Sequence, residues 1–343
     1  MTFAVAASRP PARRTPARAD RRLVLCLLIL LGHVAQACAP AGTPSATVSP
    51  VPPPPTATPT PEPPSVLLVV RDGNSLFDQE LADAVAQLAE QDSLALVRTS
   101  DLDPAALGAA TRRIVLEAGD PDLPALVAAV PDINVLAVHP GGAERFTGSA
   151  PTPSTEFELR RAFAAGYAAS LLAPEWRIAA VLPADPGDAV SAFTQGGTFG
   201  CGLCNPPYPP FAEYPLVEVS QSEADTLRAL DALAELGVTA LYLGPGLATP
   251  QVLQTATARG LLLLGADLPP EVSPEMWAAS ILPDLPAALR QVWEADGDAP
   301  ASAVAPLRLE RVDPDLFSPG RQDDVERLFT KLESGAVRVL LEP

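Results

Sequence analysis

The chain of 343 residues is poor in the side chains that most often do chemistry. It has two histidines and four cysteines, and lysine occurs once, at Lys331. His33, Cys26 and Cys38 all precede the predicted folded part, so a Ser-His-Asp or Cys-His triad, and most zinc sites, would have to use His139. There is no Walker A sequence, and no Gly-x-Gly-x-x-Gly follows the first predicted strand. We therefore expect no catalytic centre, no metal site and no cofactor.

Positive charge is scarce as well. Lys and Arg number 23 against 41 Asp and Glu, which gives a net charge of −18, and six of the arginines lie between Met1 and Ala37. Nucleic acids and anionic lipids are polyanions, so an acidic surface argues against both as partners. It says little about a small neutral ligand.

The segment 1–38 has the pattern of an export signal. Five arginines between Arg13 and Arg22 precede an apolar run, Leu23 to Leu31, which is shorter than the ~20 residues that a membrane-spanning helix needs. Ala35-Gln36-Ala37 then leads to Cys38. We predict a lipoprotein signal peptide over 1–38 with an acylated Cys38. The alternatives are ordinary cleavage just before Cys38 and an uncleaved anchor.

Residues 39–64 are a low-complexity stretch of Pro, Thr, Ser and Ala. Such a composition cannot bury apolar surface and favours extended, partly polyproline II backbone. Its position after Cys38 predicts a linker that holds a folded domain away from a membrane. A proline-rich recognition ligand is the alternative.

From residue 65 onwards, short apolar runs alternate with helical patterns. Continuous apolar runs of this length are typical of buried parallel strands, and their alternation with helices predicts an α/β fold. In the first part we predict strands over 66–70, 94–98, 113–116 and 135–138, and helices over 77–90, 104–110 and 122–129.

The second part of the chain repeats this pattern. We predict strands over 178–182, 215–219, 240–243, 261–264, 278–282, 305–312 and 337–341, and helices over 157–172, 189–196, 223–236, 250–259, 285–295 and 325–334. Small residues on the first of these helices, among them Ala165 and Gly166, would let it pack closely on a sheet. The predicted fold class is α/β with two doubly wound parallel-sheet lobes and a hinge. Lobe 1 comprises 65–155 with a return segment over 283–303, and lobe 2 comprises 156–282 with 304–343.

Cys201-Gly-Leu-Cys204 lies in a loop rich in proline and aromatic residues. A zinc site is disfavoured, because the chain is expected outside the cytosol and has no second Cys pair or His pair. A thioredoxin-like motif would stand at the start of a helix, whereas this one is predicted in a loop. We predict a short-loop disulfide that makes the loop locally rigid. Redox activity is the alternative.

Acids and one aromatic residue near strand ends are the candidate ligand contacts. Asp72, Phe77 and Asp78 flank the loop after the first predicted strand, and Asp267 follows the apolar run LLLLGA. Ligands of such folds bind at the carboxyl ends of the strands, where a carboxylate can accept hydrogen bonds from two hydroxyls and a ring can stack on a base. The alternatives are helix caps or turns for the aspartates and core packing for Phe77.

Four further residues are weaker candidates. His139, before Pro140-Gly141-Gly142, is either a cleft residue or a loop-packing residue. Tyr208, Phe211 and Tyr214 form either a rim of the site or the packing of the proline-rich loop.

The stretch 162–183, AFAAGYAASLLAPEWRIAAVLP, resembles the helix and strand that begin the second lobe in the basic membrane protein family. Phe77-Asp78-Gln79 is similar to that family's loop after its first strand. The stretches 126–139, 264–267 and 316–336 also resemble family segments. The chain departs from the family pattern at Pro269-Pro270, where Asp-Gln is usual, and after Ser280, where a Lys is usual.

The family consists of extracytoplasmic lipoproteins that bind solutes, often purine nucleosides, for ABC importers. The resemblance implies a type 1 periplasmic-binding fold and a ribose contact at Asp267. We expect a lipid-anchored solute-binding protein whose partners are a small, neutral or cationic, nucleoside-like ligand and an ABC transporter permease. A ligand-sensing or scaffold lipoprotein without a transporter is the first alternative, and an α/β enzyme is the second.

Overall fold

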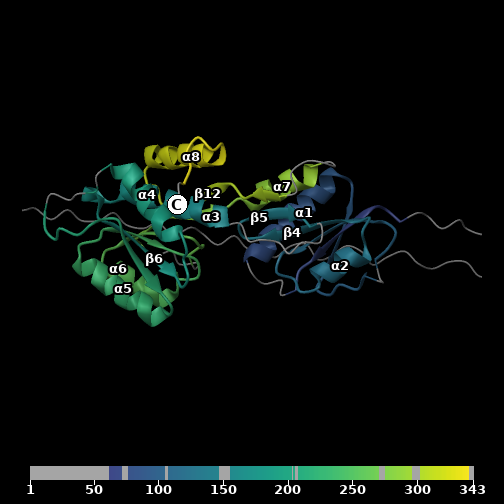
Figure 1. The fold of residues 1–343 in the computed structure, drawn as a ribbon, viewed down its shortest axis with the longest axis horizontal. Helices are drawn as coiled ribbons and strands as arrows, with labels where there is room; N and C mark the ends of the chain where they lie inside the picture. The colour runs from purple at the N-terminus through teal and green to yellow at the C-terminus, as the bar shows by residue number, and fades with distance from the viewer. Residues whose placement is uncertain are drawn as a thin grey trace, which may run out of the picture. The chain divides into compact units, whose positions relative to one another are not determined.

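The computed structural model describes residues 62–71, 76–104, 107–146, 155–202, 204, 208–269, 275–295 and 302–339 (Figure 1). The chain divides into two units, Met1–Pro59 and Thr60–Pro343. The predicted signal peptide, Cys38, most of the linker and Asp72 lie outside the described residues. No helix in the described ranges is long and apolar enough to cross a membrane.

The first sheet has six strands in the order β11-β5-β4-β3-β1-β2. Its strands are β1 (Ser65–Val69), β2 (Ala95–Thr99), β3 (Thr111–Glu117), β4 (Asn134–His139), β5 (Gly142–Arg145) and β11 (Ser302–Val304). The first four in the chain pair in parallel, whereas β5 is antiparallel to both β4 and β11. The chain turns to one side after β1 and to the other side after β2, which makes this sheet doubly wound.

Helices cover both faces of the first sheet. On one face α1 (Leu76–Gln91) and α7 (Leu285–Glu294) bury Leu81, Val85 and Leu289 in one cluster with strand residues. On the other face α2 (Leu123–Ala129) buries Leu123 and Leu126.

The second sheet also has six strands, in the order β12-β10-β9-β8-β6-β7. Its strands are β6 (Ile178–Pro183), β7 (Leu216–Ser220), β8 (Ala240–Leu243), β9 (Leu262–Gly265), β10 (Trp277–Pro283) and β12 (Leu307–Glu310). All pair in parallel except β12, which is antiparallel to β10.

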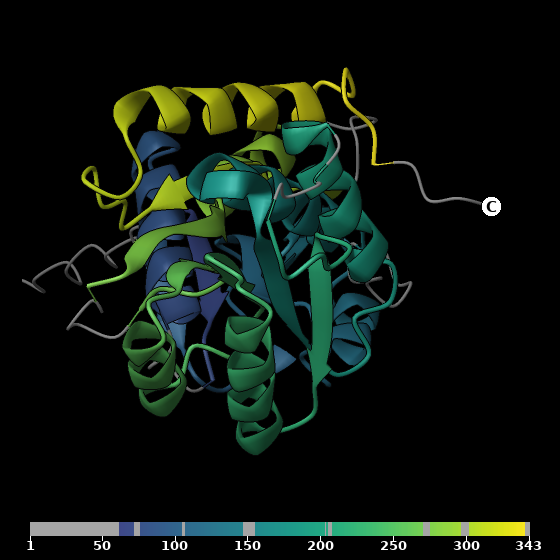
Figure 2. The ribbon, with the colours of Figure 1, turned by 90° about the vertical axis from the view of Figure 1, so that its left-hand side faces the viewer.

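The helices of the second sheet form two layers as well. One layer holds α3 (Thr155–Leu172), α4 (Ala189–Cys201) and α8 (Pro319–Glu333), and the other holds α5 (Glu223–Glu235) and α6 (Pro250–Ala258). A 3₁₀ turn, η2 (Pro174–Trp176), follows α3. Figure 2 shows α8 in yellow and the green helices α5 and α6 on opposite sides of this sheet.

Side-chain caps begin several of these helices where the sequence supplies them. The hydroxyls of Ser222 and Thr249 accept hydrogen bonds from the N–H groups of Asp225 and Val252, and the Asp284 carboxylate accepts one from Ala287. Each cap satisfies a backbone donor that the first helical turn leaves without a partner.

The small residues of α3 pack on the second sheet as predicted, and glycine also allows α3 and α4 to pack closely against each other. A methyl group added to Gly166 would come within 2.1 Å of the Phe193 carbonyl oxygen, and one added to Gly196 within 1.8 Å of the Phe163 oxygen. The same contact explains why α4 continues past Gly196 to Cys201, beyond its predicted end.

The α/β architecture with two doubly wound sheets is confirmed, but both sheets are mixed rather than wholly parallel. The predicted strand 305–312 is the shorter β12, and β11 joins the first sheet instead. Among the described strands the chain therefore passes between the sheets three times, after β5, β10 and β11. The described residues 107–110 are not helical and 337–339 are not a strand, contrary to the predictions for 104–110 and 337–341.

The unit Thr60–Pro343 contains its own hydrophobic cores. The buried clusters on both faces of both sheets are built from residues between Val66 and Leu332. We infer that this unit folds without the segment Met1–Pro59.

Candidate functional site

Each sheet has one point at which its winding direction reverses, and ligands of such folds bind at the carboxyl ends of the strands there. In the first sheet this point lies between β1 and β3, and in the second it lies between β6 and β8. Polar and charged side chains gather at these edges of both sheets.

Asp267 follows β9 at the carboxyl edge of the second sheet. Its Oδ2 accepts a hydrogen bond of 2.6 Å from the N–H of Gly246, in the loop after β8. Its backbone oxygen accepts a 2.8 Å bond from the hydroxyl of Ser280, which is fully buried in β10. Asp267 is thus fixed to the strands on either side of β9, as a preorganised ligand contact would be.

Arg161 of α3 is the buried cation near this edge. Its side chain is 6% exposed, Nη2 donates to the Glu158 carboxylate, and the guanidinium lies 5.2 Å from the Phe157 ring centroid. Within the described residues its Nε is buried with no hydrogen-bond partner. Burial lowers the pKa of Arg161, but the Tyr242 hydroxyl and the Glu158 and Asp267 carboxylates raise it more. The side chain is therefore a charged donor with unused hydrogen-bonding capacity.

Tyr242 of β8 completes this group. Burial, opposed by Arg161 and supported by Glu158 and Asp267, raises the pKa of Tyr242 to about 12. Its phenol is therefore neutral at pH 7, and the group consists of one cation, two carboxylates and one hydroxyl.

At the carboxyl edge of the first sheet, Arg71 and Asp120 form a bidentate ion pair. Arg71 Nε and Nη2 each donate to one Asp120 oxygen at 2.8 Å, and Nη2 also reaches Asp122. Arg71 lies just after β1 and Asp120 just after β3, on either side of the reversal point. Hydrogen bonds from Arg71 lower the pKa of Asp120 despite the burial of its side chain.

His139 stands at the carboxyl end of β4. Its Nδ1 accepts a 3.1 Å hydrogen bond from the N–H of Gly141, so a neutral ring carries its proton on Nε2. Burial lowers the pKa of His139, which favours the neutral form. The ring has a loop-packing role, and the ligand role stays a prediction.

The predicted contacts in α1 are both half-buried. Phe77 packs against the core cluster of the first sheet, as its alternative reading required, and Asp78 lies in the first turn of α1, where a carboxylate interacts favourably with the helix dipole. Their ligand roles stay predictions, as does that of Asp72, which lies outside the described residues.

Arg161, Tyr242, Arg71 and Asp120 were not among the predicted site residues. Arg71 and Asp120 could have been predicted, because both come just after apolar strands in the sequence. Arg161 lies within a helix and Tyr242 within an apolar strand, so only the packing of α3 on the sheet brings them to Asp267. In the described part of the chain, no group of three or more His, Cys, Asp or Glu side chains could hold a metal ion.

The proline-rich loop lies at the opposite, amino edge of the second sheet, so it is not a rim of this site. Arg177, just before β6, donates to the Tyr208 carbonyl oxygen at 2.9 Å, and the Tyr214 hydroxyl donates to the Leu236 oxygen. Tyr214 is buried, whereas Tyr208 and Phe211 are exposed. The structure places a disulfide between Cys201 and Cys204, whose Cα atoms are 5.5 Å apart.

No protein-family model matches the chain, and no curated protein matches it. Membership of the basic membrane protein family therefore stays a prediction.

Solved structures share the fold. A transcriptional activator of the comK gene from Bacillus halodurans matches with a TM-score of 0.51 and 13% identity, over 79% of this chain and 98% of that one. This likeness shows the fold alone. A second match is an ABC transporter system solute-binding protein from Aeropyrum pernix K1, with a TM-score of 0.47 and 16% identity over 82% of this chain and 94% of that one. A third is GanP, a glucose-galactose binding protein from Geobacillus stearothermophilus, with a TM-score of 0.47 and 12% identity over 73% of this chain and 98% of that one.

The fold class is thus the type 1 periplasmic-binding-protein-like one.

Proposed function

We propose that this chain is an extracytoplasmic solute-binding protein that captures a small polar ligand for an ABC importer. The ligand binds between the carboxyl edges of the two sheets. Closure about the three chain crossings stabilises the bound state, because only the closed form contacts the ligand from both sides. The protein acts by binding and not by catalysis.

The observation that carries the proposal is the fixed carboxylate of Asp267 beside the buried Arg161. Asp267 is held by a backbone N–H and a hydroxyl from the strands on either side of β9, and Arg161 keeps a buried donor without a partner in the described residues. An acceptor and a donor held in this way suit a ligand with adjacent hydroxyls.

A nucleoside is the ligand class that we propose. Asp267 would accept the ribose hydroxyls, Arg161 would donate to a ribose oxygen, and Phe77 would stack on the base. Asp72, Asp78 and His139 complete the proposed contacts from the first sheet.

The membrane attachment is a proposal from the sequence. Acylation at Cys38 anchors the chain, and the proline-rich stretch 39–64 acts as the stalk. A stalk of this kind would let the folded unit reach a permease in the same membrane.

Thermal unfolding of the 60–343 fragment with nucleosides, nucleobases, sugars and amino acids tests the proposal. A ligand at 100 times its dissociation constant adds about 2.7 kcal/mol to the free energy of unfolding. We expect this shift with nucleosides. We expect Asp267→Asn and Arg161→Met to abolish it while the proteins remain folded, because asparagine keeps the shape of Asp267 and the Glu158 carboxylate that Arg161→Met leaves unpaired is 47% exposed to water.

Asp231→Asn on α5 is the matched control, because that carboxylate is half exposed in a surface ion pair. It should keep the full shift. A shift with another class of compound would support the solute-binding role and overturn the proposal that the ligand is a nucleoside. No shift with any compound would overturn the proposal.

A ligand-sensing or scaffold lipoprotein without a transporter is the second candidate. A protein described as a transcriptional activator shares the fold, so this fold is compatible with roles other than transport. Uptake of the bound ligand by a permease reconstituted with the protein separates the two: uptake supports transport, and tight binding without uptake supports sensing.

A further inference from the structure

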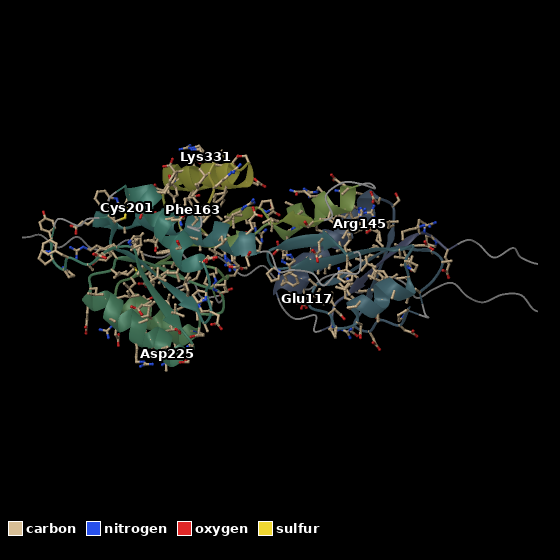
Figure 3. All side chains as sticks on the ribbon, viewed as in Figure 1. Glu117, Arg145, Phe163, Cys201, Asp225 and Lys331 are labelled. Atoms are coloured by element: carbon tan, nitrogen blue, oxygen red, sulfur yellow. A yellow bond between two sulfur atoms is a disulfide. The ribbon has the colours of Figure 1, made fainter. Side chains whose placement is uncertain are left out.

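A cavity of about 530 Å³ lies on the α3–α4–α8 side of the second sheet, away from the carboxyl edge. Phe163, Thr194, Thr198, Phe199, Val337 and Arg338 are among its lining residues. Figure 3 labels Phe163 of α3 and Cys201 at the end of α4, both on the side that α8 covers. The volume is within the ~300–1,000 Å³ range of small-molecule sites.

Aromatic rings form one wall of this cavity. Phe199 is 54% exposed, although its ring lies 5.6 Å from that of buried Phe163 and 5.9 Å from that of Tyr167. Phe163 and Phe199 both line the cavity, and the exposed ring of Phe199 gives a surface that an apolar molecule would remove from water.

Both threonine hydroxyls of the cavity already donate hydrogen bonds to backbone oxygens. Thr194 donates to the Val190 oxygen at 3.0 Å, and Thr198 donates to the Thr194 oxygen at 2.9 Å. They offer lone pairs rather than donors, so they cannot bind an anionic group.

Arg338 supplies the charge. Nearby Arg160 and Arg327 are paired with Glu156 and Asp324, whereas in the described ranges Arg338 takes part in none of the ion pairs. Its guanidinium is exposed and borders the cavity. A carboxylate or sulfonate is the group that it recognises best, through paired N–H donors.

A neighbouring cavity of about 330 Å³ is less suitable. It shares Val337 and Arg338, but the other residues around it include no aromatic side chain and do include the Glu156 carboxylate. Glu156 is paired there with Arg160, so it is the missing aromatic ring that makes this cavity less suitable for a ligand with an apolar body.

We propose that the cavity beside Phe199 is a second binding site, for an amphipathic anion. The apolar body of the ligand covers Phe199 and its acid group pairs with Arg338. The site is independent of the ligand proposed at the carboxyl edge, and medium-chain fatty acids and aromatic acids share the required chemistry.

The test uses the 60–343 fragment and the fluorescent aromatic sulfonate 8-anilinonaphthalene-1-sulfonate. Titration should show one dominant site. We expect Phe199→Ala to weaken its affinity about tenfold, and Arg338→Gln to weaken it about fivefold. Neither side chain is fully buried, so both variants should fold.

The matched controls change the same residue types elsewhere. Phe211→Ala removes a ring that is 73% exposed at the amino edge of the sheet, and Arg228→Gln removes a side chain that is 79% exposed on α5. Both should leave the affinity unchanged. An equal loss with Phe211→Ala, or no loss with Phe199→Ala, would overturn the site.

Head-group competition tests the charge. Dodecanoate should displace the probe, and dodecyltrimethylammonium should do so much less well. Arg338→Gln should remove that difference. Equal displacement of the probe from the unchanged protein by the cation and the anion would overturn the assignment to Arg338.

Discussion

At the residue scale, the buried charges Asp120 and Arg161 each have a partner or a packing surface that supports them. The Asp120 side chain is 3% exposed and accepts two hydrogen bonds from Arg71. The Arg161 guanidinium donates to the Glu158 carboxylate and lies near the ring of Phe157. A buried charge without such support would lose its proton or gain one. Both pairs lie near strand ends, where the fold places its ligands.

Asp120 should make stability depend on acid pH. Its folded pKa lies below the unfolded value near 3.9, so its contribution is present above that value and is lost as pH falls through the folded pKa. Asp120→Asn should cost roughly 1 kcal/mol at pH 7, because Arg71 is partly solvated, and less at pH 2. Urea unfolding at the two pH values measures this. Equal losses at both would show that the effect is steric.

At the element scale, close packing decides the position of α3 and α4, whereas amphipathic pattern decides that of most other helices. α3 has eleven buried residues distributed around it, including Phe157 at its start and Leu172 at its end. It is covered by the sheet on one side and by α4 and α8 on the others, so an all-round apolar sequence is what its position requires.

Gly196→Ala should therefore destabilise the 60–343 unit. The added methyl group would meet the backbone of Phe163, which cannot move without shifting α3, and such overpacking costs about 1–3 kcal/mol. Gly320→Ala in α8 is the control, because nothing lies within 4 Å of the added group there. It should leave stability unchanged or raise it, since alanine favours helix. Thermal unfolding of both variants is the measurement.

The disulfide at the end of α4 closes a very short loop. Loop-closure entropy predicts less stabilisation than the ~3 kcal/mol of a 15-residue loop. Cys201→Ser with Cys204→Ser should therefore lower the free energy of unfolding by less than about 2 kcal/mol. Alkylation without reductant, followed by mass measurement, should show no labelling of these two residues in the unaltered protein. Full labelling would contradict the disulfide.

At the scale of the whole unit, an ion pair joins a helix of the first sheet to a strand of the second. Arg308 of β12 lies 3.0 Å from the Glu80 carboxylate of α1. Burial raises the pKa of Glu80, Arg308 lowers it, and Asp284 and Glu310 raise it further. The net upward shift means that ionised Glu80 is disfavoured in the folded state despite its partner.

Glu80→Gln tests which effect dominates. A raised folded pKa gives stability that is present below the unfolded value near 4.3 and is lost as pH rises through the folded pKa. The glutamine variant should match the unaltered protein at pH 4 and equal or exceed its stability at pH 7. Urea unfolding at both pH values checks this. A clear loss at pH 7 would mean that the ion pair outweighs burial.

The α/β architecture could be predicted because each apolar strand and each helical repeat is a local pattern. The positions of most elements could be predicted for the same reason, including the strand before Asp267. The antiparallel edge strands could not be predicted. β5 turns back to pair with β4, and β12 pairs with β10 only after the chain has crossed to the first sheet and returned. Likewise Gly196 indicates a helix end in the sequence, and only its contact with Phe163 shows why α4 continues.

The sequence by itself determined the repeat of strand and helix, the acidic surface and the aspartate at the end of β9, since these follow from the order and composition of neighbouring residues. Only the tertiary structure decided that Arg161, from a helix much earlier in the chain, lies near Asp267, and that Phe163, Phe199 and Arg338 share one cavity. Such groupings depend on how helices pack on a sheet, and packing is a property of side-chain shape across distant segments that no local pattern records.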